Sequence, residues 1–225
     1  MAFQSENCLQ ANAWICPEYI LTRGDELLAA TSEHVILTVV SVIAGFLLAL
    51  PLAVLSRRYV RLRGGVLGIT TAIYTIPSLA LFSILVPFTG LGAATVITAL
   101  TLYSLTILVR NMLAGLLAVP DDVTEAARGM GYGSARLLFT VELPLALPAI
   151  LAGLRVATVS TVSLVTIGAL IGTGGLGNLI YEGFASFFRA QVLTASVLCV
   201  VLAIVADLAL VGTGRVLTPW RRGVA

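Results

Sequence analysis

Residues 125–131 have the sequence EAARGMG, and residues 141–144 have the sequence VELP. The first stretch has the composition of a short polar helix that ends at glycine, and the second leads into a break at its proline. Together they predict a polar helix–turn–helix. Because the surrounding sequence is far more apolar, this segment indicates where the chain leaves an apolar environment.

The composition excludes a soluble globular protein. Of the 225 residues, 59% are hydrophobic and 11% are charged, whereas soluble domains have roughly 25% charged residues. The mean hydropathy of +1.04 therefore places the chain in a lipid bilayer. All 13 basic residues are Arg, so the chain cannot form a glycine-rich phosphate loop that ends in Gly-Lys-Ser/Thr. Any ATP hydrolysis that drives this protein must take place on another chain.

Apolar runs of about 20 residues are long enough to cross the ~30 Å hydrocarbon core as helices. We therefore expect an all-α, polytopic membrane protein with about five transmembrane helices. Pro77 in the second span and Pro148 in the fourth predict kinks or short breaks. The five expected spans are His34–Ser56, Val66–Phe88, Gly92–Leu113, Pro144–Ile171 and Gln191–Gly214.

The distribution of Arg predicts the orientation. The link between the first two spans, Ser56–Arg63, has four Arg, and the positive-inside rule places it in the cytoplasm. The same side then receives the loop with Arg110, Arg128 and Arg136 and the tail with Arg215, Arg221 and Arg222. The acidic leader lies outside, with Glu6, Glu18, Asp25, Glu26 and Glu33.

The expected organisation is an extracytoplasmic leader at residues 1–33, a transmembrane domain at 34–216 with a polar loop at 118–140, and a cytoplasmic tail at 217–225. The leader lacks a basic segment followed by a short apolar run, so we expect no removable signal peptide. Nucleic-acid binding by the Arg cluster is not favoured in so hydrophobic a chain, and no nucleic-acid partner is expected.

Three cysteines and one histidine carry little predicted chemistry. Cys8 and Cys16 lie in the leader and can pair in an oxidising compartment, although we favour two free thiols. Cys199 is interpreted as a packing residue in the last span, and His34 as a polar group at the outer end of the first. No metal-ligand cluster and no Ser/His/Asp set emerges, so we expect neither a metal site nor an enzyme.

The polar loop has the pattern of a docking helix. Asp122 and Glu125 have the spacing of a capping box at its start, and Gly131 and Gly133 are expected to end it. Ser134 can cap the helix that follows. The spacing of Val123, Ala126, Ala127 and Met130 gives one small apolar face that suits a groove on a partner. The alternative is a helix on the inner leaflet, which should be richer in bulky and basic residues.

Glu125-Ala126-Ala127, Gly131 and the later Val141 and Leu143-Pro144 resemble the EAA motif of ABC-importer permeases at the family's spacing. In that family the loop is a coupling helix held in a cleft of a cytoplasmic ATPase, and ATP-driven closure switches the permease between inward- and outward-open states. The resemblance implies that these seven residues couple the permease to the ATPase. It also implies import, a pair of permease subunits and a separate extracytoplasmic substrate-binding protein.

Longer stretches indicate the cargo. They resemble permeases of osmoprotectant importers, which carry glycine betaine, carnitine, choline and related quaternary amines, and the resemblance covers nearly everything after His34. Methionine importers share the EAA motif and the glycine-rich loop and remain the alternative cargo class. The matching stretches are residues 76–81 (IPSLAL), 99–104 (ALTLYS), 141–148 (VELPLALP) and 172–177 (GTGGLG).

A quaternary ammonium is recognised by aromatic faces. Tyr74, Phe82 and Tyr103 are the candidates for lining a passage, although a packing role is favoured for each. Gly172, Gly174 and Gly177 match a dinucleotide-binding pattern but follow a membrane span instead of a strand, so no cofactor is expected. We expect a tight turn there, with an outer mouth or a set of interface anchors formed by Asn178, Tyr181, Phe184, Phe187 and Phe188.

Arg155 in the fourth span and Asp207 in the fifth both lie toward the cytoplasmic side and can pair. Burying either charge alone would be costly, so we favour a structural ion pair. The alternative of another class is a proton-coupled secondary transporter in which Asp207 titrates. Such folds usually show paired repeats, which five spans with a single polar loop do not provide.

Overall fold

The computed structural model describes residues 7–219. Glu6 of the leader and Arg221 and Arg222 of the expected tail lie outside the described residues. Within this range every regular element is helical, as the all-α prediction requires. The helices are α1 (Pro17–Thr22), α2 (Gly24–Arg58), α3 (Val60–Thr75), α4 (Ser78–Thr89), α5 (Ala93–Leu117), α6 (Asp121–Gly129), α7 (Ser134–Leu137), α8 (Leu143–Val165), α9 (Leu176–Ala185) and α10 (Arg189–Leu217). A π-helical turn, η1 (Leu138–Glu142), joins α7 to α8, and a 3₁₀ turn, η2 (Thr166–Ile171), follows α8.

Four helical segments in the described chain are long and apolar enough to cross a membrane: α2, α5, the continuous run Ser134–Ile171, and α10. The helices α3 and α4 meet the same criteria only as a pair bent by 99°, which is the geometry of a broken span or of a re-entrant loop. The break falls at Ile76-Pro77, as predicted, because proline has no N–H and keeps the preceding residue out of the helical conformation.

The structure corrects two details of the spans. The first begins at Gly24 rather than His34, so the second part of the expected leader continues directly into α2. Pro148 does not break its helix, since α8 runs through it to Val165. The irregularity lies earlier, in η1, which directly precedes the turn that contains Pro144.

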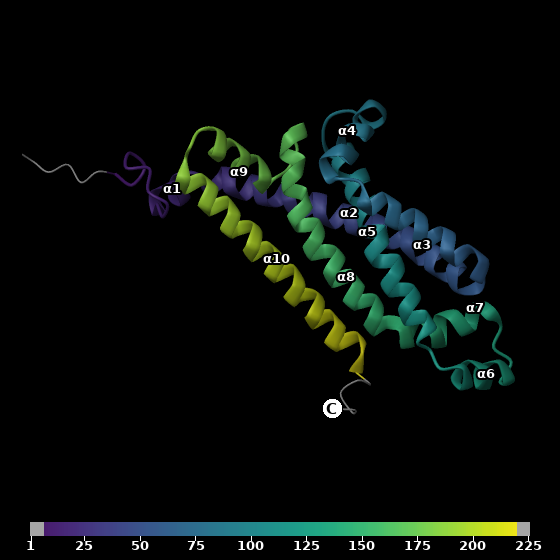
Figure 1. Ribbon diagram of the computed structural model, residues 1–225. Helices are drawn as coiled ribbons and strands as arrows, with labels where there is room; N and C mark the ends of the chain where they lie inside the picture. Colours follow the sequence, from purple (N-terminus) through teal and green to yellow (C-terminus); the bar gives the residue numbers. More distant parts are fainter. Residues whose placement is uncertain (1–6, 220–225) are drawn as a thin grey trace, which may run out of the picture.

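Helix α5 forms the centre of the fold. It contacts α2, α3, α4 and α8, and its residues form most of the largest core cluster. Gly45 of α2 packs directly against Ser104 of α5, where any side chain would collide with the Ser104 hydroxyl. Small residues at such contacts let membrane helices approach closely. Helix α10 instead packs on the outside, against α8 and α9 (Figure 1).

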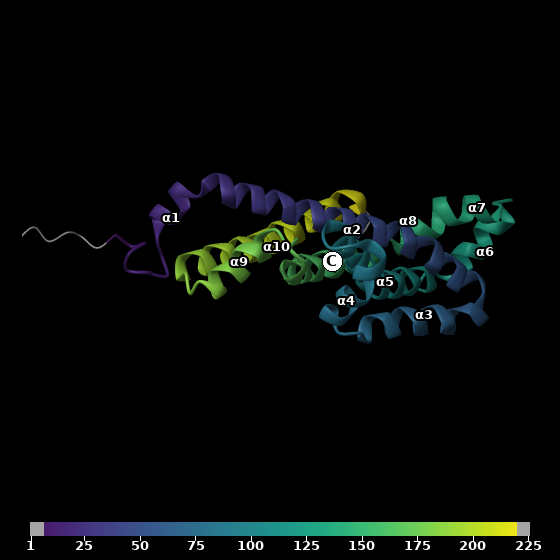
Figure 2. The same ribbon diagram turned by 90° about the horizontal axis from the view of Figure 1, so that it is seen from above.

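The two ends of the molecule carry different elements. Helices α1 and α9 lie at one end, and α6 and α7 lie at the opposite end, both in Figure 1 and in the perpendicular view of Figure 2. Helix α2 runs between the two ends, and its last turn holds Arg57 and Arg58. The basic link after α2 and the polar loop therefore lie on the same side of the fold, which the predicted orientation requires.

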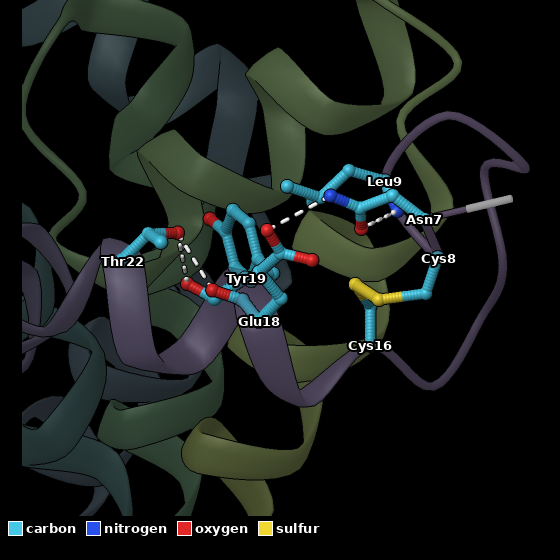
Figure 3. Close-up of a disulfide and its surroundings, with 7 residues drawn as sticks. All are labelled: Asn7, Cys8, Leu9, Cys16, Glu18, Tyr19 and Thr22. Atoms are coloured by element: carbon cyan, nitrogen blue, oxygen red, sulfur yellow. Dashed lines mark hydrogen bonds between the residues drawn. A yellow bond between two sulfur atoms is a disulfide. The ribbon is translucent and has the colours of Figure 1, made fainter. Parts of the chain in front are cut away.

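The N-terminal segment is closed by a disulfide between Cys8 and Cys16, whose Cα atoms are 5.4 Å apart (Figure 3). The expectation of two free thiols is therefore wrong. The pairing arises because the segment turns back on itself: the Asn7 side-chain amide donates to Glu18 Oε1 at 2.8 Å, and Tyr19 packs edge-on against Phe188 at 5.2 Å. These contacts hold both cysteines against α9 and α10.

We expect the leader thiols to be oxidised in cells. In a Cys199→Ser background, denatured protein that has not been reduced should take up no maleimide, whereas reduced protein should be labelled at both Cys8 and Cys16. Intact-mass measurement distinguishes the two states. Full labelling without reductant would show that the leader carries free thiols.

His34 also differs from the expectation, because it is completely buried instead of lying at an interface. Its Nε2 lies 2.9 Å from the carbonyl oxygen of Val162 in α8 and donates to it. The glycine-rich loop passes so close that a Cβ on Gly175 would lie 2.7 Å from the His34 Cβ. His34 thus connects α2, α8 and the loop that leads into α9.

Candidate functional site

Helix α6 (Asp121–Gly129) occupies the position of the expected docking helix, but its ends are built differently. The N-cap is Pro120, and no side chain caps the helix. The predicted capping box is wrong because the N-cap lies two residues before Asp122, so that Asp122 is already inside the first turn. Ser134 is likewise the first residue of α7 and does not cap it. Asp121 and Asp122 still favour the positive end of the helix dipole.

One side of α6 anchors it to the protein. Thr124 and Ala127 are buried, and the Ala127 carbonyl accepts a hydrogen bond from the Tyr132 N–H at 3.1 Å. Gly131 has a φ of +85°, a backbone conformation that side chains other than glycine rarely adopt. The turn after α6 is therefore fixed by the sequence, and with it the direction in which the chain enters α7.

The opposite side of α6 is open. Glu125 and Ala126 are exposed, and so are the apolar side chains of Val123 and Met130, the latter at 70%. Of the predicted apolar face, only Ala127 points into the protein. A Cβ on Gly129 would meet no atom within 4 Å, so the outer surface is shallow as well as apolar. Such a surface fits close approach by a partner protein.

A buried ion pair, which sequence reasoning missed, ties the polar loop to the first span. Glu142 Oε1 lies 3.0 Å from an Arg57 side-chain nitrogen, and Glu142 is only 8% exposed. Arg57, Arg58 and Arg128 line the same open pocket beside this pair. The sequence carried two signals for this ion pair. Glu142 is a lone acidic residue near Pro144 in an apolar stretch, and a cluster of Arg follows the first span.

The later residues of the expected motif link the loop to the core. Val141, Leu143 and Pro144 are all half-buried, and Leu143 packs against the core cluster around α5. They lie on the continuous helical run from Ser134 to Ile171. Only residues 130–133 separate the end of α6 from this run.

The three candidate passage residues have different environments. Tyr74 is 45% exposed, and its ring lies edge-on to that of Tyr103 with centroids 5.7 Å apart. The Tyr103 hydroxyl donates to the carbonyl of Ile76, which the break before Pro77 leaves free. Phe82 is completely buried, and Tyr103, which is only 6% exposed, belongs to the same core cluster.

The glycine-rich stretch forms a turn between η2 and α9. Beyond it, Tyr181, Phe184 and Phe187 are exposed on α9 and the turn that follows, while Asn178 is half-buried. Phe188 packs against Tyr19 of the leader. The Asn12 side chain bridges this turn by donating to the Phe187 carbonyl at 2.9 Å and accepting from the Arg189 N–H at 3.0 Å.

Arg155 and Asp207 join α8 to α10 through two parallel hydrogen bonds of 2.8 Å each. Both carboxylate oxygens of Asp207 are engaged, which does not favour a role as an isolated titrating group. In residues 7–219 no group of three His, Cys, Asp or Glu side chains could hold a metal ion.

Breaking this pair is expected to lower the yield of assembled protein several-fold, because Asp207→Asn leaves a charged Arg155 without a counter-ion in the membrane. Exchanging the charges with Arg155→Asp and Asp207→Arg should restore most of the yield, measured by size-exclusion chromatography in detergent. Full assembly of Asp207→Asn with complete loss of uptake would instead assign Asp207 to transport.

The geometry defines a class of protein: an all-α, multi-pass membrane protein with a short exposed polar helix at one end. The chain belongs to the family described as binding-protein-dependent transport system inner membrane component, whose sequence profile matches residues 41–223. Membership confirms the family resemblance found in the sequence.

Relatives of known name cover almost the whole chain. It is 37% identical over 202 residues to the choline transport system permease protein OpuBB of Bacillus subtilis, covering 90% of this chain and 93% of the relative. It is also 37% identical over 205 residues to the glycine betaine/carnitine/choline transport system permease protein OpuCD of the same organism, covering 91% and 90%. The osmoprotectant import permease protein OsmW of Salmonella typhimurium is 36% identical, with 89% and 96% covered.

Solved structures share the fold. A permease chain from inward-facing conformations of the MetNI methionine ABC transporter superposes with a TM-score of 0.81 at 26% identity, covering 91% of this chain and 100% of that chain. A bacterial alginate ABC transporter, solved in complex with its periplasmic protein, gives a TM-score of 0.75 at 15% identity, covering 94% and 87%. The fold is therefore that of ABC-transporter permeases.

Proposed function

We propose that this chain is the permease subunit of an ATP-driven importer for quaternary-amine osmoprotectants such as glycine betaine, carnitine and choline. The observation that carries the proposal is similarity along about nine tenths of the chain to permeases named for these cargoes. Methionine is less well supported as cargo, because identity to the methionine transporter is 26–28% whereas identity to these relatives is 34–37%.

We infer the partners from the family, and the arrangement of the two ends supports where each would bind. A cytoplasmic ATPase engages the open face of α6, and an extracytoplasmic binding protein delivers cargo to the end that carries α1 and α9. The N-terminus lies outside and the C-terminus inside, as the Arg distribution predicts. Because two ATPases need two docking helices, the permease works as a dimer or with a homologous subunit.

Transport then proceeds by alternating access. ATP binding draws the two ATPases together, and α6 moves with the ATPase that holds it. The motion reaches α8 through the continuous run from Ser134 and reaches α2 through the Arg57–Glu142 ion pair. Since α2 and α8 both pack on α5, the displacement shifts the spans against each other and opens the outer side. Hydrolysis resets the cycle.

The cargo class is tested by growth. A bacterial host without its own osmoprotectant uptake should grow in high-salt medium with glycine betaine or choline only when it carries this chain with its genomic-neighbour ATPase and binding protein. The control is a second host that lacks methionine uptake and requires methionine. Rescue of the methionine-requiring host alone would overturn the proposed cargo class while leaving the importer assignment intact.

A further inference from the structure

Arg110 is a charged residue without a counter-ion in the middle span. It lies seven residues before the end of α5 and is exposed. Its guanidinium donates to the Thr71 hydroxyl at 2.7 Å, but it has no carboxylate partner in the described part of the chain. By contrast, Arg57 and Arg155 are each paired with a carboxylate. A membrane span that carries an unpaired cation is costly unless an anion or water reaches it.

The Arg110 side chain does not extend toward the polar loop, as an Arg that faces lipid near this end of α5 would. An Arg that faces lipid near a helix end extends toward the nearest aqueous interface. Helix α5 ends just before the polar loop. Helix α3 begins beside the basic link, and Thr71 lies eleven residues after its start. Arg110 nevertheless reaches Thr71. The guanidinium therefore points toward the middle of the membrane and not toward the cytoplasmic surface.

An aromatic pair lies above Arg110 on the same two helices. Tyr74 is one turn beyond Thr71 on α3, and Tyr103 precedes Arg110 by seven residues, or about 10 Å, on the same face of α5. The two rings are edge-on at an interplanar angle of 76°, and nearly half of Tyr74 is exposed. Tyr103 is buried, so the ring that can receive a cation is that of Tyr74, and quaternary ammonium groups are bound by aromatic rings in this way.

The helix break adds an independent observation. Non-helical backbone at membrane depth is tolerated where it is buried in protein or lines a water-filled cavity. The break at Ile76-Pro77 begins two residues after Tyr74, and α3 and α5 lie side by side in the fold (Figure 1). Arg110, the exposed ring of Tyr74 and the break at Ile76-Pro77 therefore lie on one surface of α3 and α5.

We propose that this surface is a cargo-binding stretch of the translocation path, in which Arg110 binds the carboxylate of a zwitterionic amine while the exposed ring of Tyr74, packed edge-on against the buried Tyr103, receives its quaternary ammonium group. The inference rests on the proposed function and refines it. The planar guanidinium forms two parallel hydrogen bonds to a carboxylate. Glycine betaine and carnitine carry both groups, whereas choline carries only the cation. Arg110 is then a specificity-determining residue.

The test compares uptake of glycine betaine with uptake of choline in vesicles that hold the complete importer. Arg110→Gln should lower the ratio of glycine betaine to choline uptake by about tenfold or more, because the charged hydrogen bonds to the carboxylate are lost. Tyr74→Leu should weaken uptake of both amines alike. Arg61→Gln, at an exposed Arg near the start of α3, is the matched control and should leave the ratio unchanged.

If Arg110→Gln does not assemble, Arg110→Lys keeps the charge without the planar geometry and should lower the ratio by a smaller factor. An equal fall for both amines in the Arg110 variants would overturn the inference and leave the proposed function standing. If the wild type takes up choline but not glycine betaine, the inference is also overturned and the proposed function stands. Wild-type uptake of neither amine would overturn both.

Discussion

Replacing Ala126 by Trp is expected to lower ATP-dependent uptake by about tenfold or more, the largest effect that a single substitution on α6 should produce. Ala126 is exposed and lies among Val123, Gly129 and Met130 on the open side of the helix. The surface there is shallow, so an indole would hold the ATPase away from α6. Because the inward side is anchored by Thr124 and Ala127, the permease itself should still fold.

The matched control is Ala209→Trp, the same change at an exposed position on the outer helix α10. It should leave both uptake and assembly close to those of the wild type. Co-purification of the ATPase with each variant separates loss of docking from loss of folding. Normal uptake by Ala126→Trp would mean that the open face of α6 is not the surface that engages the motor.

Glu142→Leu is expected to destabilise the permease by about 3 kcal/mol, because it leaves the Arg57 guanidinium half-enclosed without a counter-ion. For a chain of this size the loss corresponds to a fall of roughly 6–12 °C in melting temperature. The measurement is thermal unfolding of the purified permease in detergent. Glu182→Leu, which removes an exposed acid on α9, should have little effect.

The double variant Arg57→Met and Glu142→Leu removes both charges together and should recover most of the lost stability, since an apolar pair can replace a buried ion pair. Its uptake should nevertheless stay below that of the wild type if the pair also transmits motion from the loop to α2. Equal melting temperatures for Glu142→Leu and the wild type would show that the ion pair contributes little in the membrane.

Features fixed by local covalent geometry could be predicted from the sequence. The break at Pro77 follows from a missing N–H and from the restricted conformation of the preceding residue. The turn at Gly131 needs a positive φ that glycine adopts easily. The positions of the long apolar helices follow from the length of the apolar runs. Each of these depends on a few neighbouring residues and not on the assembled fold.

Features that depend on distant contacts could not be predicted. The partner of Glu142 lies 85 residues earlier in the chain, at Arg57. The burial of His34 depends on α8 and the glycine-rich loop, and the pairing of Cys8 with Cys16 depends on the fold of the leader against α9 and α10. The predicted N-cap of α6, Asp122, was wrong by two positions, because tertiary contacts decide where a short helix begins.

The central claim, that a separate ATPase drives quaternary amines through this chain, is tested most directly by radiolabelled uptake into vesicles. These should contain the permease, its genomic-neighbour ATPase and its binding protein, and they should be measured with and without ATP, for the wild type and for a Glu125→Arg and Gly131→Pro variant. The account predicts ATP-dependent uptake of glycine betaine or choline that the variant loses. Uptake that does not depend on ATP, or that the variant retains, would contradict it.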